Sequence, residues 1–294
     1  MDFLRPTTWQ EALAARAERP GALPLQGGTD VMVEINFDVR RPEALLDLTG
    51  VAELREWSVT GGVCRLGAGV TYATVIDELG GALPGLAQAS RTVGSPQIRN
   101  RGTVGGNLGA ASPAGDSHPP LLAAGAAVEV ESRERGLRTI PAHAFYLGVK
   151  RPALEPDELI RAVRIPVAAG PQYFSKVGTR NAMVIAVCSF ALALHPEERR
   201  VGTGIGSAAP TPLRALEAED FLSRELDWDA ALDLDWDAAL DAGLLRRFGE
   251  LCAAAAAPID DVRGTAAYRR HAVAVMARRT LTWAWDDHRG RRAA

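Results

Sequence analysis

Two pairs of adjacent glycines, each set among small polar side chains, are the residues of this sequence best suited to hold a ligand. The first pair lies in a run made up of Pro24, Leu25, Gln26, Gly27, Gly28, Thr29, Asp30 and Val31. Glycines let backbone N–H groups approach a ligand closely, and the start of a following helix adds free N–H donors and the positive end of its dipole. The run therefore predicts a pyrophosphate-binding turn, although an ordinary strand-to-helix turn would have the same sequence.

The second pair lies in a run made up of Thr103, Val104, Gly105, Gly106 and Asn107, and the stretch Ala111–Asp116 follows it. Thr103 and Asn107 would add side-chain donors to the glycine backbone. Asp116 could accept hydrogen bonds from a ribose or a neutral ring N–H, or it could cap the helix that starts near Pro119. Two such turns in one domain favour a single elongated dinucleotide that is held from two sides.

The signatures of several other chemistries do not occur in the sequence. It contains no GxSxG elbow, no HExxH motif, no GxxxxGK[ST] loop and no Rossmann GxGxxG. The three cysteines, Cys64, Cys188 and Cys252, form no CxxC pair that could cradle zinc or an iron–sulfur cluster. Their scatter indicates a reducing compartment, so we expect a cytoplasmic protein.

The composition is that of an ordinary globular protein, with 294 residues, of which 47% are hydrophobic and 23% are charged. This length suggests about two domains. The formal net charge of −3 leaves no basic surplus for binding nucleic acid or an anionic membrane. No secretory signal is expected at the start, and the longest apolar run, Ala182–Leu194, is too short to cross a bilayer.

The glycine pairs must be positioned by helices and strands that alternate without a regular βαβ rhythm, which favours an α+β fold. A capping box at Thr8–Glu11 predicts a helix over Trp9–Arg19. Strands are expected at Leu23–Gln26, Ala44–Leu48, Leu159–Ile165, Gln172–Val177, Val184–Leu194 and Val201–Ala208, with hairpins over 57–68 and 127–140. Further helices are expected at Tyr72–Leu79, Leu83–Ser90, Pro119–Ala124, Leu213–Leu222, Leu244–Ala257 and Tyr268–Trp285.

Three stretches stand outside this pattern. Thr92–Ala114 is dense in Gly, Ser, Asn and Pro, and we expect a long irregular loop of the kind that often carries function. Pro166–Gly170 is a candidate linker between two domains. The octapeptide LDWDAALD occurs twice in tandem, at Leu226–Asp233 and Leu234–Asp241. Its aspartates do not have EF-hand spacing, so we expect a solvated acidic surface.

As an ordered set, these motifs resemble those of the FAD-binding medium subunits of the molybdenum hydroxylases. That family includes carbon monoxide dehydrogenase and the flavin domain of xanthine dehydrogenase. The resemblance is carried by Gly27–Asp30, Ile98–Asn107 and Ala111–Asp116, with weaker matches at Asp157–Ile160 and at Phe174–Lys176 with Arg180. It covers nearly the whole chain.

The resemblance implies a fold as well as a site. Two small α+β lobes, over residues 1–168, would clasp FAD in a PCMH-type fold, and a C-terminal α+β flavoprotein domain would follow over residues 169–294. Pro24–Val31 would wrap the pyrophosphate, Thr103–Asn107 would complete that cradle, and Asp116 would hold a polar part of the cofactor. Further FAD contacts are implied for Val93, Ser112, Ile160 and Lys176.

Two of these positions have a particular chemistry. Lys176 lies where a partly buried lysine would stabilise negative charge on the reduced flavin. Val93 stands where a relative has an aromatic residue near the ring, so at this position the chain departs from the family and lacks that stacking side chain.

The resemblance also implies a division of labour between subunits. The flavin subunits of this family do not transform the organic substrate. Electrons would come from a molybdopterin-containing large subunit, through [2Fe–2S] clusters in a small subunit, and would leave the flavin for NAD, a quinone or oxygen. The chain would thus be part of an oxidoreductase.

Two alternatives remain open. A self-sufficient flavin reductase or oxidase on the same fold would need a proton donor beside the flavin, for which His118 is the nearby candidate. A nucleotide-binding interaction module would need no open flavin face.

Overall fold

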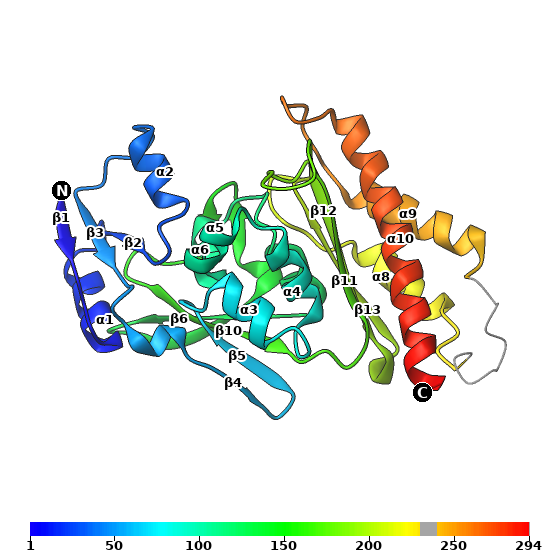
Figure 1. The fold of residues 1–294 in the computed structure, drawn as a ribbon, viewed down its shortest axis with the longest axis horizontal. Coiled ribbons are helices and arrows are strands. Elements are labelled where there is room, and N and C mark those ends of the chain that lie inside the picture. Colours follow the sequence, from blue (N-terminus) through cyan, green and yellow to red (C-terminus); the bar gives the residue numbers. More distant parts are fainter. Residues whose placement is uncertain (230–239, 294) are drawn as a thin grey trace.

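The computed structural model describes residues 1–229 and 240–293. They form three parts in a row: an N-terminal lobe, a middle lobe and a C-terminal domain (Figure 1). Helices and strands are mixed in every part, which confirms the expected α+β class. Among the described helices, none combines the length and the apolar character that a membrane span requires.

The N-terminal lobe is a small parallel sheet with one helix packed beside it. Its strands lie in the order β1 (Asp2–Leu4), β3 (Ala44–Asp47) and β2 (Leu23–Leu25). Helix α1 (Trp9–Glu18) begins at the expected capping box, in which Glu11 N–H donates to the Thr8 hydroxyl. Helix α2 (Val31–Asn36) follows β2, stands away from the sheet and buries none of its residues (Figure 1).

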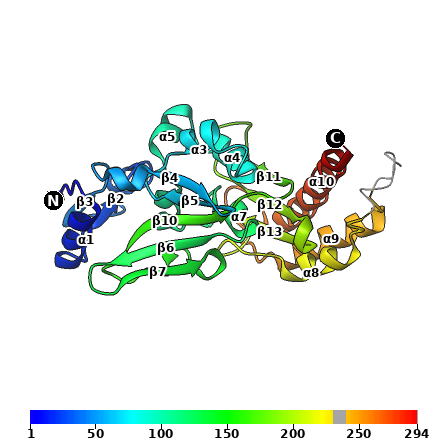
Figure 2. The ribbon, with the colours of Figure 1, turned by 90° about the horizontal axis from the view of Figure 1, so that it is seen from below.

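The middle lobe is an antiparallel sheet with helices above one face (Figure 2). The strands lie in the order β4 (Trp57–Thr60), β5 (Val63–Gly67), β10 (Leu159–Pro166), β6 (Ala127–Ser132) and β7 (Gly136–Pro141). The helices are α3 (Tyr72–Glu78), α4 (Pro84–Arg91), α5 (Pro96–Arg101), α6 (Val104–Ala110) and α7 (His118–Ala123). A short separate pair of strands, β8 (Tyr146–Gly148) and β9 (Arg151–Pro152), contacts α6.

The expectation of an irregular loop over Thr92–Ala114 is wrong, because helices α5 and α6 lie within it. The side chains of Ser95 and Thr103 accept hydrogen bonds from the first turns of these two helices and so cap them. Glycines at 105, 106 and 109 lower the intrinsic helix propensity of α6. Its close packing against the end of β5 outweighs that preference.

The C-terminal domain is an antiparallel sheet between two sets of helices. Strands β11 (Gln172–Val177), β12 (Cys188–His195) and β13 (Arg200–Gly206) pair in sequence order. One face meets α4 and α7 of the middle lobe, and the other meets α8 (Leu216–Glu225) and α10 (Ala266–Ala293) (Figure 1). Helix α9 (Ala242–Ala255) packs beside α10.

The ends of several elements differ from those expected. The strand expected from Val184 begins at Cys188. Met183, just before the expected start, has a positive φ of 49°, which is not an extended strand conformation. The helix expected from Leu213 begins at Leu216, since Leu213 makes an antiparallel bridge with Ile205 instead. The last helix continues beyond the expected Trp285.

The buried side chains form two main cores. One is shared by the N-terminal and middle lobes and runs from Trp9 to Ile165. The other belongs to the C-terminal domain and includes Leu226 and Trp228, which begin the first LDWDAALD copy. The two aspartates next to Trp228, Asp227 and Asp229, are exposed, as expected of an acidic surface. The rest of the first copy and nearly all of the second lie outside the described residues.

Candidate functional site

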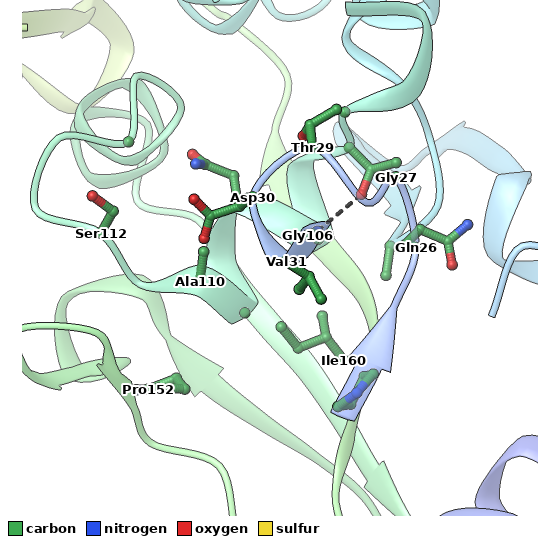
Figure 3. A pocket seen from close by; sticks show the side chains of 18 of the residues that line it. Gln26, Gly27, Thr29, Asp30, Val31, Gly106, Ala110, Ser112, Pro152 and Ile160 are labelled. Carbon is green, nitrogen blue, oxygen red and sulfur yellow. Dashed lines mark hydrogen bonds between the residues drawn. The ribbon is translucent and has the colours of Figure 1, made fainter. Parts of the chain in front are cut away.

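A cavity of about 830 Å³ lies where the two N-terminal lobes meet, with the edge of the C-terminal domain beside it. Figure 3 shows its walls: Gly27, Thr29 and Asp30 come from the turn between β2 and α2, Val31 begins α2, and Gly106 comes from α6. Both glycine pairs that the sequence singled out therefore face one space. We call the turn Gly27–Asp30 the glycine turn.

The glycine turn brings the two lobes together backbone to backbone. A Cβ on Gly27 would overlap the carbonyl oxygen of Arg101, so no larger residue fits there, and Gly28 has a φ of +75°. In the described part of the chain, the main-chain N–H groups of Gly27, Gly28, Thr29 and Asp30 donate no hydrogen bond. Four consecutive free donors at a cavity wall suit an anionic or acceptor-rich ligand group.

The opposite wall is helix α6, which lies close to β5. A Cβ on Gly105 would lie 2.5 Å from the carbonyl oxygen of Ala68, so only glycine allows this approach. Gly106 N–H donates to the Thr103 hydroxyl at 2.9 Å, the contact drawn as a dashed line in Figure 3. This amide is engaged by the helix cap, so the free donors of the cavity come from the glycine turn.

Asp116, Lys176 and Thr92 form a buried group that we call the carboxylate corner. Asp116 Oδ2 accepts from Lys176 Nζ at 2.5 Å and from the Thr92 hydroxyl at 3.2 Å. Lys176 lies on β11, so the corner joins the C-terminal domain to the middle lobe. The Lys176 and Asp116 side chains are 8% and 7% exposed. Burial raises the pKa of Asp116, and the neighbouring ammonium of Lys176 opposes that rise.

Asp116 also has an acceptor atom without a partner. It lines the cavity, and its Oδ1 is buried without a hydrogen-bond partner. The side-chain Oε1 of Gln26, another lining residue, is in the same state. Buried oxygens without donors are costly, so both indicate a ligand that carries N–H or O–H groups.

His118 does not face the cavity and is held neutral. It is fully buried at the start of α7 and does not line the cavity, and its Nδ1 lies 2.9 Å from the Tyr146 hydroxyl. Burial lowers the pKa of His118 to about 3. A neutral imidazole outside the cavity wall is not suited to act as the proton donor that a self-sufficient flavoenzyme would need.

Most residues expected at the site line this cavity, and three do not. Leu25 is buried in β2, Val104 is buried in the shared core, and Lys176 lies behind Asp116. The expected residues that do line it are Pro24, Gln26, Gly27, Gly28, Thr29, Asp30, Val31, Val93, Thr103, Gly105, Gly106, Asn107, Ser112, Asp116 and Ile160.

The cavity also has walls that the sequence motifs did not indicate. Arg16 comes from α1, Tyr72 from α3 and Lys150 from the β8–β9 turn, while Val184 and Ile185 come from the C-terminal domain. Gly94 and Gly115 also line the cavity, and the sequence did point to them, because they belong to the stretches Thr92–Ala114 and Ala111–Asp116. The others carried none, since only the tertiary fold brings them to the cavity.

The donors and acceptors of the cavity fit FAD. The free N–H groups of the glycine turn suit its pyrophosphate. The unpartnered Oδ1 of Asp116 and Oε1 of Gln26 suit its ring N–H, amine or hydroxyl groups. The lining extends from the N-terminal lobe to Val184 of the C-terminal domain, and the volume of about 830 Å³ is in the range of ligand-binding sites.

Comparison with known families covers almost the whole chain. Residues 1–168 match the family model described as the FAD binding domain in molybdopterin dehydrogenase. Residues 173–284 match the model of the CO dehydrogenase flavoprotein C-terminal domain.

Individual relatives agree with these family matches. The chain is 32% identical over 287 residues to the carbon monoxide dehydrogenase medium chain of Afipia carboxidovorans, which covers 95% of each chain. It is 32% identical over 229 residues to the xanthine dehydrogenase FAD-binding subunit of Escherichia coli O157:H7, which covers 74% of this chain and 77% of that one.

Solved structures show the same architecture. A crystal structure of the Cu,Mo-CO dehydrogenase superposes with a TM-score of 0.85 and 30% identity, over 99% of this chain and 98% of that one. Quinoline 2-oxidoreductase from Pseudomonas putida 86 shares the fold, with a TM-score of 0.86 at 24% identity, over 97% and 96% of the two chains.

Proposed function

The chain belongs to the family of FAD-binding medium subunits of the molybdenum hydroxylases, and we propose that it passes electrons from [2Fe–2S] clusters in a partner subunit to an external acceptor. A molybdopterin-containing large subunit would supply those electrons. Relatives named as a medium chain and as an FAD-binding subunit support a role as one member of such a complex. The acceptor would be NAD, a quinone or oxygen.

The cavity is the observation that carries this proposal, and we propose that its lining residues hold FAD. The free N–H groups of Gly27, Gly28, Thr29 and Asp30 would bind the pyrophosphate, and Asp116 Oδ1 would accept a hydrogen bond from the cofactor. Lys176 would act through Asp116, by holding that carboxylate in place and balancing its charge. Bound FAD supplies the redox chemistry; the chain supplies orientation and electrostatics.

The rest of the chain would support this role. We propose a domain boundary after residue 168, where β10 has ended and β11 has not begun. The three cysteines are free and buried, which supports a cytoplasmic location, where thiols stay reduced. The neutral, buried His118 disfavours a flavoenzyme that would protonate its own substrate.

A visible absorption spectrum tests the proposal directly. The chain purified alone is expected to keep flavin bands through gel filtration after FAD is added. Gly106→Val should abolish them, because a branched side chain would fill the cavity wall. Gly81→Val is the matched control, since a Cβ there meets nothing within 4 Å.

Co-expression with molybdenum and iron–sulfur partners extends the test to electron transfer. The proposal predicts that the flavin bands of the assembled complex bleach when the substrate of the large subunit is added. Flavin that stays oxidised in a complex with reduced clusters would contradict it. Unchanged FAD binding in Gly106→Val would show that the cofactor lies elsewhere.

A further inference from the structure

Glu34 and Lys150 form an ion pair across the cavity, between parts of the chain that are far apart in sequence. Lys150 Nζ donates to Glu34 Oε1 at 2.5 Å, and both residues line the cavity. Glu34 belongs to α2 of the N-terminal lobe, and Lys150 belongs to the β8–β9 turn of the middle lobe. The carboxylate is 13% exposed and the ammonium side chain 46%, so the contact is partly shielded from water.

Helix α2 has little hydrophobic packing to hold it in place. None of its residues is buried, the side chains of Met32 and Val33 are exposed, and Phe37 directly after the helix is 79% exposed. Arg40 also contacts Glu34, at 3.3 Å, but it belongs to the same lobe and adds no link between lobes. Lys150 therefore ties α2 to the middle lobe, in addition to the packing of Gly27 on Arg101.

The backbone of Lys150 indicates that its side chain is used. Its φ is +54°, in the left-handed region that glycine adopts more readily than lysine. Its N–H donates to the carbonyl of Ala111, at the end of α6, which fixes the turn to the cavity wall. A lysine kept in an unfavourable conformation at a cavity edge points to a role for the ammonium group.

We propose that the Glu34–Lys150 pair is a latch that holds α2 over bound FAD and slows the release of the cofactor. Both residues are positioning residues for FAD. Opening the pair frees α2 and the glycine turn that precedes it, and so exposes the four donor N–H groups to water. This inference rests on the proposed function, because it takes the cavity as the FAD site.

The rate of FAD dissociation tests the latch. The full chain is loaded with FAD and diluted, and the recovery of flavin fluorescence gives the rate. Lys150→Gly is the best variant, because glycine suits the left-handed turn and removes the latch without straining the fold. Lys150→Gly and Glu34→Gln should each release FAD about fivefold faster, the scale of a partly shielded charged hydrogen bond.

Three comparisons separate a latch from a general effect on stability. The double variant should release FAD no faster than either single variant, because both remove one contact. Lys150→Arg should stay near the wild-type rate. Arg41→Met is the matched control, since it removes an exposed ion pair with Asp38 just after α2 that links nothing across the cavity.

Salt and hydrogen exchange give readouts that do not depend on activity. At about 1 M salt, where the Debye length is about 3 Å, the wild-type rate should approach that of the variants. Without FAD, amides of α2 should exchange faster in Lys150→Gly than in Arg41→Met.

Wild-type dissociation rates in both Lys150→Gly and Glu34→Gln would overturn the latch. If Gly106→Val abolishes FAD binding in the same experiments, the cavity stays the FAD site and the latch alone fails. If Gly106→Val binds FAD normally, the proposed function of the cavity fails, and the latch fails with it.

Discussion

The glycine turn and the carboxylate corner face the same cavity, but they are built in opposite ways. The glycine turn offers uncharged main-chain N–H groups from four consecutive residues. The carboxylate corner offers one oxygen of a buried ion pair, whose members lie 60 residues apart and in different domains. One site element is local and neutral, whereas the other is long-range and charged.

The difference shows how each element can fail. The glycine turn depends on space, because a Cβ on Gly27 would meet the backbone of Arg101. The carboxylate corner depends on charge balance, because Asp116 is buried and Lys176 is its cationic neighbour. It also follows that residues 1–168 contain the glycine turn but not the whole corner, so the C-terminal domain helps to build the cavity.

Among the variants that compare these two elements, Gly27→Ala is expected to have the largest effect, since its added methyl group has no room in the glycine turn. The added methyl group must push the two lobes apart against a backbone carbonyl, at a cost of about 3 kcal/mol, or roughly a hundredfold in FAD affinity. Fluorescence titration with FAD measures the affinity. Gly81→Ala, which meets nothing within 4 Å, should bind like the wild type. Equal affinities for the two variants would show that the lobes do not meet at Gly27.

Lys176→Met tests the carboxylate corner by removing its positive charge. It leaves Asp116 buried without its cationic neighbour, and loss of one partner of a buried pair costs about 3 kcal/mol of stability at neutral pH. Urea denaturation measures this loss. Adding Asp116→Asn should recover part of it, because the stranded charge is then gone. Arg199→Met, which breaks an exposed pair with Asp229, should change stability by no more than about 0.5 kcal/mol.

The loss in Lys176→Met should also depend on pH. Without Lys176, burial alone acts on Asp116 and its folded-state pKa rises further. A folded-state pKa above the unfolded value means that the folded protein binds the proton more tightly. The free energy of unfolding is then highest at low pH and falls as pH rises through the folded pKa. Lys176→Met should therefore cost less at about pH 5 than at about pH 8, and equal costs would contradict the buried charge.

Local patterns predicted the parts of the site that are local in the chain. The capping box at Thr8, the hairpin turn at Gly61–Gly62 and the glycine turn each depend on a few consecutive residues, and the structure has all three features. Helix α6 could not be predicted in this way. Its glycines disfavour a helix locally, and for Gly105 the long-range contact with Ala68 explains the choice of residue.

Long-range contacts set the limit for the rest of the site. The sequence motifs pointed to Asp116 and Lys176 separately, as two contacts of the cofactor. The structure joins them into one pair, with Lys176 outside the cavity lining. Val184 and Ile185 reach the cavity only because the C-terminal domain docks on α4 and α7, and no local pattern encodes that docking.

Thr103→Ala is expected to have the smallest effect, and it separates the contribution of helix α6 to stability from its contribution to FAD binding. The hydroxyl of Thr103 caps α6 through Gly106 N–H, and losing a cap costs about 1 kcal/mol. Asp241→Ala removes an equivalent cap from α9, where Asp241 accepts from Leu244 N–H. Helix α9 contributes no residue to the cavity lining. Both variants should therefore lose similar stability in thermal denaturation. Only Thr103→Ala should also weaken FAD binding, by about threefold, because its helix forms a wall of the cavity. Equal FAD affinities in the two variants would mean that α6 supports the fold without shaping the cofactor site, and the glycine turn and the carboxylate corner would then account for recognition by themselves.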